Sequence, residues 1–87
     1  MTAVVDAPLG GPPALRRAAD VRLALASALL WRVVDRTGRV IGHLEAYSAG
    51  GGVRYRARRF HSGSRAFRDL GDFWSADDAV ECLRYAR

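Results

Sequence analysis

The sequence predicts one small α+β domain: an antiparallel sheet of three or four strands, backed by a C-terminal helix and preceded by an N-terminal helix. Between positions 31 and 61, β-branched and aromatic residues alternate with polar ones around glycine-containing turns, which is typical of an antiparallel meander. From Ser75 onwards, apolar residues recur instead at helical spacing. The chain has 87 residues, enough for one domain, which we assign to residues 14–87.

The N-terminal part divides into an arm and a predicted helix. Met1–Pro13 contains three prolines and two glycines with little to bury, so we expect a flexible arm. Ala14–Leu29 is rich in Ala and Leu at helical spacing, and the proline before it suits the start of a helix. The stretch Val21–Leu23 is equally compatible with the start of a strand. As a helix, the segment has excess apolar surface, so it lies against the sheet or pairs two copies of the chain.

The predicted strands are Trp31–Arg36, Arg39–Tyr47 and Val53–His61, the first two joined by a turn at Thr37-Gly38, with Arg65–Leu70 as a short fourth strand. The core residues are even-numbered on the second strand and odd-numbered on the third. Directly paired residues should therefore sum to an odd number, which the short connection puts near 100. Glu45 should then lie opposite Arg54 or Arg56, and His43 opposite Arg56 or Arg58.

Positive charge is concentrated on the third predicted strand. Residues 53–68 contain six arginines and no acid, whereas residues 69–87 contain two arginines and five acids. Arg54, Arg56 and Arg58 alternate with apolar residues, so their side chains should share one exposed face, and we call these three residues the arginine ridge. The adjacent Arg58 and Arg59 break the alternation, so we expect a bulge there and a return of Phe60 to the core.

The C-terminal helix is the best-marked element of the sequence. Ser75 and Asp78 form a capping pair at its start, and Arg84 and Arg87 suit the negative end of the helix dipole. The apolar stripe consists of Ala76, Ala79, Val80, Leu83 and Ala86. This stripe should cover the core face of the sheet.

The segment Leu70–Val80 resembles the strand-to-helix junction of the plant ethylene-response-factor DNA-binding domain, and of the similar arm-binding domains of some tyrosine integrases. The matching positions are Leu70, Gly71, Phe73, Ser75, Ala76 and Ala79, which are structural residues in that family. The likeness covers the last two-thirds of the chain in layout and this junction in motif. It implies a three-stranded sheet backed by one helix, with an exposed sheet face that reads DNA. The exposed arginines of the corresponding strands are Arg39, Arg54, Arg56 and Arg58.

The charge pattern and the resemblance together predict a nucleic-acid-binding protein, with duplex DNA favoured as the partner. The predicted site consists of Arg39, His43, Arg54, Arg56, Arg58, Arg65 and Arg68. Arginines at alternate strand positions lie about 7 Å apart, close to the spacing of phosphates along a nucleic-acid strand. Arginine can also read guanine in the major groove. Glu45 should neutralise one ridge arginine, and the others have no partner that the sequence reveals.

The alternative is a small adaptor that docks an acidic protein through the same face or through its N-terminal helix. Trp31, Tyr47 and Trp74 are the residue types that anchor such interfaces. Salt separates the two hypotheses, because nucleic-acid binding falls steeply with ionic strength and a packed protein interface falls less.

Other functions are disfavoured. We find no nucleophile with a placed base, so we do not expect an enzyme or a small-molecule substrate. His43, His61 and Cys82 lack the spacing of metal ligands, so we expect no metal or other cofactor. The single cysteine and the shortness of the apolar run at residues 23–31 favour a cytoplasmic protein without a membrane partner.

Overall fold

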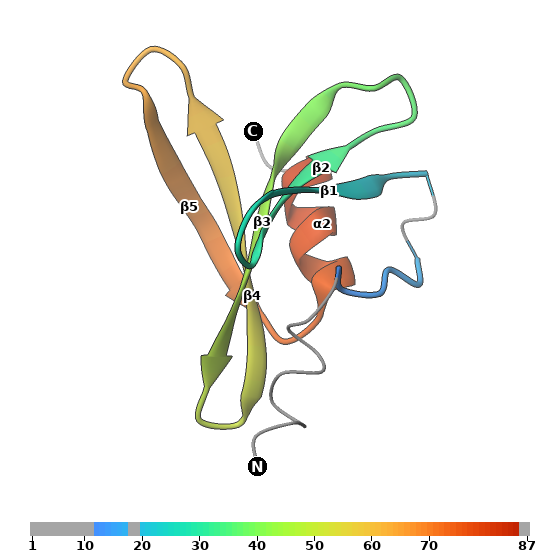
Figure 1. The fold of residues 1–87 in the computed structure, drawn as a ribbon, viewed down its shortest axis with the longest axis vertical. Coiled ribbons are helices and arrows are strands. Elements are labelled where there is room, and N and C mark those ends of the chain that lie inside the picture. Colours follow the sequence, from blue (N-terminus) through green and yellow to red (C-terminus); the bar gives the residue numbers. More distant parts are fainter. Residues whose placement is uncertain (1–11, 18–19, 86–87) are drawn as a thin grey trace.

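The computed structural model describes residues 12–17 and 20–85, in which five strands are followed by one helix. The strands β1 (Arg22–Ser27), β2 (Leu30–Val34), β3 (Val40–Ala49), β4 (Gly52–His61) and β5 (Ala66–Phe73) form one antiparallel sheet in sequential order. The helix α2 (Ala76–Tyr85) packs on one face of this sheet (Figure 1). The α+β class and the antiparallel meander are confirmed, but the sheet has five strands rather than three or four. The predicted arm falls outside the described residues, except for Pro12 and Pro13.

The predicted N-terminal helix, Ala14–Leu29, is wrong. Its second half is β1, and none of its described residues is helical. The strand pairs antiparallel with β2, with Leu23 opposite Val33, and Leu23 packs against the core. This pairing outweighs the weak helical preference of an Ala- and Leu-rich sequence, because propensity contributes well under about 1 kcal/mol per residue. Pairing of two chain copies through a helix in this segment therefore has no structural basis.

The described residues before β1 lie against α2. The Asp77 carboxylate accepts hydrogen bonds from the backbone N–H groups of Arg16, at 3.0 Å, and Arg17, at 2.9 Å. An ion pair of 2.6 Å joins Asp20 to Arg84 near the other end of the helix. We call residues 12–17 the strap. These contacts hold the strap on the helix side of the sheet, so its described part leaves the arginine ridge uncovered.

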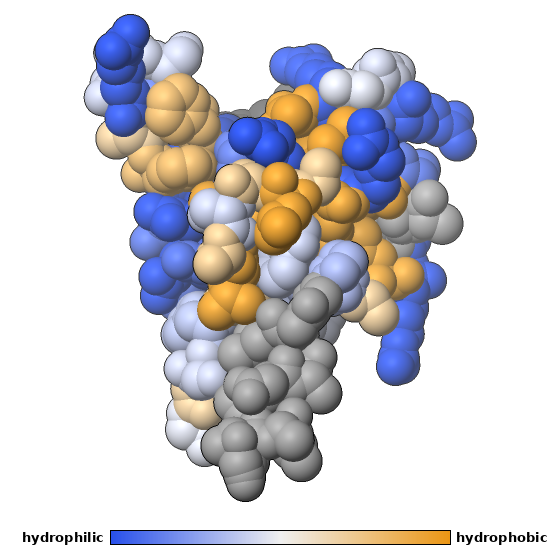
Figure 2. Space-filling view, viewed as in Figure 1, coloured by the Kyte–Doolittle hydropathy of each residue, from blue (hydrophilic) through white to orange (hydrophobic). Residues whose placement is uncertain are grey.

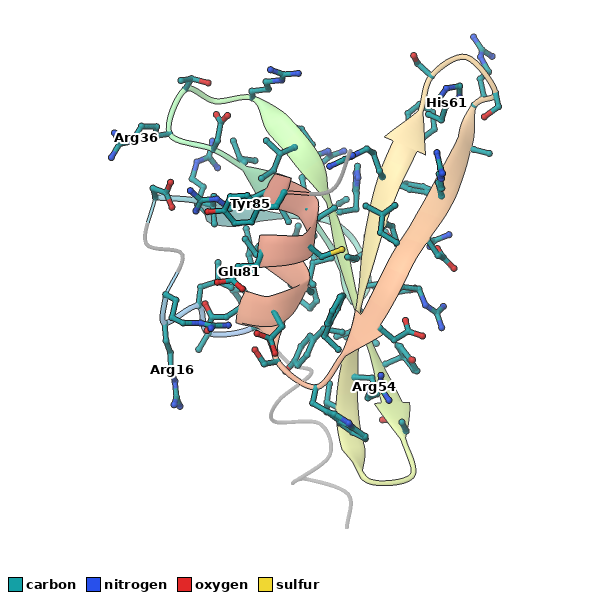
Figure 3. All side chains as sticks on the ribbon, turned by 180° about the vertical axis from the view of Figure 1, so that it is seen from behind. Arg16, Arg36, Arg54, His61, Glu81 and Tyr85 are labelled. Atoms are coloured by element: carbon teal, nitrogen blue, oxygen red, sulfur yellow. The ribbon has the colours of Figure 1, made fainter. Side chains whose placement is uncertain are left out.

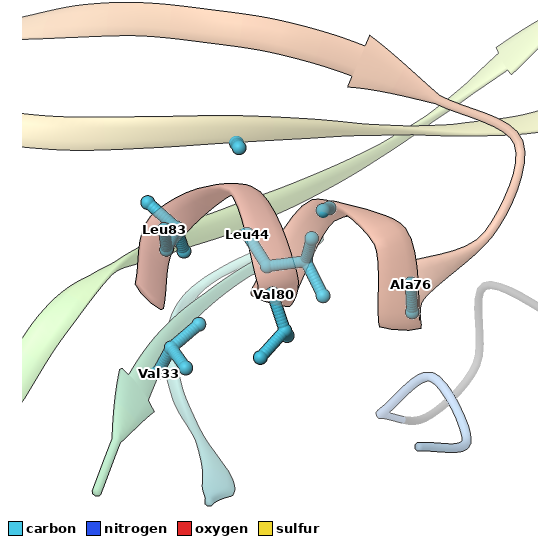
Figure 4. Packing of buried hydrophobic residues seen from close by; sticks show 7 residues of the cluster. Val33, Leu44, Ala76, Val80 and Leu83 are labelled. Carbon is cyan, nitrogen blue, oxygen red and sulfur yellow. The ribbon is translucent and has the colours of Figure 1, made fainter. Parts of the chain in front are cut away.

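The hydrophobic core lies between α2 and the inner face of the sheet, as Figure 4 shows. Val33, Leu44, Val80 and Leu83 are its largest fully buried side chains, each no more than 2 % exposed. The predicted stripe is confirmed at Ala76, Ala79, Val80 and Leu83, all of them buried, and Ala86 lies outside the described residues. The capping pair is also confirmed, because the Asp78 N–H donates to Ser75 Oγ at 3.1 Å.

The register of β3 and β4 follows the odd-sum prediction. Paired residues sum to 101, with Glu45 opposite Arg56 and His43 opposite Arg58. The turn predicted at Thr37-Gly38 is also present, with Gly38 at a φ of 89°. The paired parts of β3 and β4 therefore present to the core the faces that the sequence assigns to them.

The bulge predicted at Arg58 and Arg59 is wrong in its placement. The irregularity lies beside these residues, but its extra residue is Leu70 on β5. Strand β4 keeps its alternation, so Arg59 lies on the helix side and Phe60 lies on the outer face instead of in the core. The helix side accommodates Arg59 because its Nη2 donates to the carbonyl oxygen of Leu83, at 2.6 Å, near the negative end of α2.

Candidate nucleic-acid interface

The arginine ridge lies on the outer face of the sheet, opposite α2, and each of its guanidinium groups lies over an aromatic ring. Arg54 stacks on Trp74 with its Cζ 4.3 Å from the ring centre. Arg56 lies over Tyr47 and Arg58 over Phe67, each at 4.6 Å. Cation–π contacts of this kind favour one position of an otherwise flexible side chain.

Three carboxylates lie among the three arginines. Arg56 Nε donates to Asp72 Oδ1 at 2.8 Å, and Arg58 Nε donates to Asp69 Oδ1 at 2.9 Å. Glu45 Oε1 lies between the two guanidinium groups, 3.5 Å and 3.6 Å from their Nη1 atoms. This oxygen is shielded from solvent and accepts no hydrogen bond from any described residue.

The expectation of a single carboxylate partner on the ridge is therefore wrong. The three arginines are balanced by three acids, so the formal charge of this group is zero. Asp69 and Asp72 supply the additional negative charge because β5 continues to Phe73 and runs beside β4 over its whole length. The strand predicted from the sequence ended at Leu70 and did not include Asp72.

The ion pair of Arg56 and Asp72 shifts the pKa values of both residues. The hydrogen bond from Arg56 holds the pKa of Asp72 below its usual value and raises the pKa of Arg56. Burial, together with the positive charges of Arg32 and Arg58, lowers the pKa of His43. His43 is therefore neutral at pH 7 and adds no charge to the ridge.

The remaining predicted site residues lie away from the centre of the ridge. Arg39 is beside the turn between β2 and β3, and Arg65 and Arg68 belong to the hairpin of β4 and β5. In a meander these two turns are at the same end of the sheet, as Figure 1 shows. Arg54 is at the opposite end, which Figure 3 shows by its label and that of His61. No described carboxylate lies within 4.0 Å of the side-chain nitrogens of these four arginines.

Arg39 borders a groove of about 800 Å³ that also reaches Leu83 and Arg84 of α2. It opens where the pairing of β3 and β4 ends, at His43 and Arg58. Its walls include Arg36, Arg39, His43, Arg59 and Arg84. The structure thus brings Arg54, Arg56 and Arg58 together with Glu45, and it places His43 between them and the groove. Arg39 lines the groove, and whether it widens the arginine ridge, as the sequence suggested, stays a prediction.

No family model, curated protein or solved structure matches the chain. The resemblance to the ethylene-response-factor domain therefore remains a prediction. In the described part of the chain, no helix is long and apolar enough to cross a membrane. Over the same residues, no three His, Cys, Asp or Glu side chains are grouped as metal ligands.

Proposed function

We propose that the protein binds nucleic acid, with duplex DNA favoured, through the outer face of β3, β4 and β5. The proposal rests on the geometry of Arg56 and Arg58. Each of these side chains is fixed by an aspartate at Nε and an aromatic ring beneath its guanidinium group, on a face that solvent reaches.

This geometry suits base recognition better than phosphate binding. The short hydrogen bond to each aspartate uses Nε–H, and a guanidinium group has four further N–H donors on its terminal nitrogens. A fixed guanidinium group with free terminal donors matches the O6 and N7 acceptors of guanine in the major groove. The arginine ridge and its three acids together have no net charge, which argues against a row of phosphate contacts there.

We assign phosphate binding instead to the arginines around the ridge. Arg39, Arg54, Arg65 and Arg68 have no carboxylate partner in the described part of the chain. Arg68 lies opposite Arg59 and is therefore directed to the helix side, so three of these arginines are placed for a duplex on the outer face. If Arg39, Arg54 and Arg65 engage phosphates of B-form DNA, log K falls with log salt at a slope of about −2.7. In this arrangement the surrounding arginines supply affinity and the two clamped arginines supply sequence preference.

The test is a set of binding curves with a selected duplex and a random duplex at two salt concentrations. Arg56→Ala should lower the preference for the selected sequence by about 5- to 150-fold, as expected for one lost base contact. Asp72→Asn should release Arg56, so binding to random duplex rises and the preference for the selected sequence falls. Glu81→Gln makes the same charge change on the exposed helix surface and should alter neither. The proposal fails if the wild-type protein binds no duplex at about 50 mM salt.

The adaptor remains the second candidate, and the neutral ridge favours it. A face that combines balanced ion pairs with exposed aromatic side chains, such as Phe60 and Trp74, is also suited to a protein partner. The helix-mediated form of this hypothesis is dropped, because none of the described residues of Ala14–Leu29 is helical. A partner that binds this face with almost no salt dependence would favour the adaptor.

We further propose a binding protein without enzymatic activity that resides in the cytoplasm. The one cysteine, Cys82, is free, which suits a reducing compartment.

A further inference from the structure

The outer end of the β4–β5 hairpin, residues 60–68, extends beyond the part of the sheet that α2 covers, and we call it the distal hairpin (Figure 1). All of its residues are exposed. Its strands remain paired to the end, with Phe60 opposite Phe67 and His61 opposite Ala66. The turn is tied by His61 Nδ1, which accepts a hydrogen bond from the Ser64 N–H at 3.2 Å. The distal hairpin is therefore a formed structure and not a loose loop.

Two exposed phenylalanines lie side by side on its outer face. Phe60 is 47 % exposed and Phe67 is 36 % exposed, and their rings meet edge to face with centres 5.4 Å apart. Phe67 is held from the other side by His43, at 4.9 Å, and by Arg58, at 4.6 Å. Phe60 lacks these neighbours, so it is the member of the pair whose ring is more open to solvent.

The surroundings of this pair are basic. Residues 59–68 contain no acid, and Arg65 and Arg68 have no carboxylate within 4.0 Å among the described residues. Asp69, the next residue, is already bound to Arg58. Figure 2 shows hydrophobic residues beside strongly hydrophilic ones at this end of the molecule, at the upper left.

An exposed ring on a basic hairpin with an arginine that has no carboxylate partner is the chemistry that recognises a nucleobase together with its phosphates. Within an intact duplex each base is already stacked on its neighbours, and a ring that enters the stack must first unstack them. An unpaired base offers a free face to the ring without this cost. We infer that the distal hairpin stacks Phe60 on an unpaired base while Arg65, in the turn of the hairpin, contacts an adjoining phosphate. Arg68 lies opposite Arg59, on the other face of the hairpin, and takes no part in this contact. The ligand is then a duplex that carries a single-stranded extension. This inference rests on the proposed function, because the duplex part binds the outer face of the sheet.

The experiment compares a blunt duplex with the same duplex bearing a short single-stranded extension. The extension should tighten binding by about 5- to 150-fold for one stacked base. Phe60→Ala should abolish this gain and leave affinity for the blunt duplex unchanged, whereas Phe60→Trp should retain it. Tyr85→Ala removes an exposed aromatic side chain from the helix and should have no effect. A 2-aminopurine in the extension should change its fluorescence on binding the wild-type protein and not on binding Phe60→Ala.

Failure of the inference is distinguishable from failure of the proposed function. If the blunt duplex binds and the extension adds nothing, or if Phe60→Ala keeps the full gain, the stacking role is refuted and the duplex interface stands. If neither ligand binds the wild-type protein, both proposals fail.

Discussion

Replacement of Gly42 by alanine tests the closest contact between the sheet and the helix. A Cβ at position 42 would overlap Cδ2 of Leu83 and lie 2.9 Å from its Cδ1 and 3.0 Å from its Cγ. Leu83 is 2 % exposed, so its side chain cannot turn away into solvent. Overpacking a core costs about 1–3 kcal/mol. The lower chain entropy of unfolded alanine offsets about 0.5–1 kcal/mol of this. We expect a net loss of about 1–2 kcal/mol, which lowers the melting temperature by about 5–15 °C.

The assay is thermal or urea unfolding followed by circular dichroism, with Gly50→Ala as the matched control. A Cβ at Gly50 would meet no atom within 4 Å, so this variant should stay within about 0.5 kcal/mol of the wild type. A double-mutant cycle identifies the contact. Leu83→Ala alone should cost about 2–5 kcal/mol, and Gly42→Ala should cost less in that background, with a coupling of about 1 kcal/mol. Equal stability of Gly42→Ala and Gly50→Ala, or additive effects of the two core substitutions, would refute this account of the packing.

Two further predictions concern the strap and the histidine beside the ridge. Asp77→Ala should destabilise the protein by about 1–3 kcal/mol, because the half-buried N–H groups of Arg16 and Arg17 lose their acceptor. Asp78→Ala, at an exposed site, should cost less than about 1 kcal/mol, and equal losses in urea unfolding would contradict the assigned role of Asp77. His43 has a lowered pKa, so below about pH 6.5 the unfolded chain binds a proton that the folded chain does not, and stability should fall as the pH decreases from there. His43→Gln should reduce the pH dependence of unfolding between about pH 5 and 7, and an unchanged dependence would disprove the assignment.

The strand register and the helix could be predicted because each depends on a local pattern. Apolar positions of period two fixed which residues of β3 and β4 face each other, and a capped stripe of helical spacing fixed the buried face of α2. The N-terminal segment could not be assigned, because Leu23, Ala26 and Leu30 suit a helix while Leu23 and Leu25 also suit a strand. Only the pairing with β2 decides between them.

The three arginines of the candidate site were predicted from the sequence, but two of the acids that balance their charge were not. The sequence places three arginines on one face, and it also shows that the acids of residues 69–87 follow them. It does not show that Asp69 and Asp72 come to lie beside the ridge, because that depends on the extra residue at Leu70 and on the full length of β5. The sequence also does not show that the side chain of Arg59 can lie on the helix side. It can do so because it donates to a helix carbonyl group 24 positions later, a contact between residues far apart in the chain.

The strap also has a consequence for the order of folding. Asp77 and the backbone N–H of Arg17 are 60 positions apart, whereas neighbouring strands are joined by short turns. Contacts between nearby residues form first, because closing a longer loop costs more chain entropy. The hairpins and the helix can therefore assemble before the strap docks. In the native state we expect the reverse order of opening, with the amides of Arg16 and Arg17 exchanging with solvent through local undocking while the central strands stay closed.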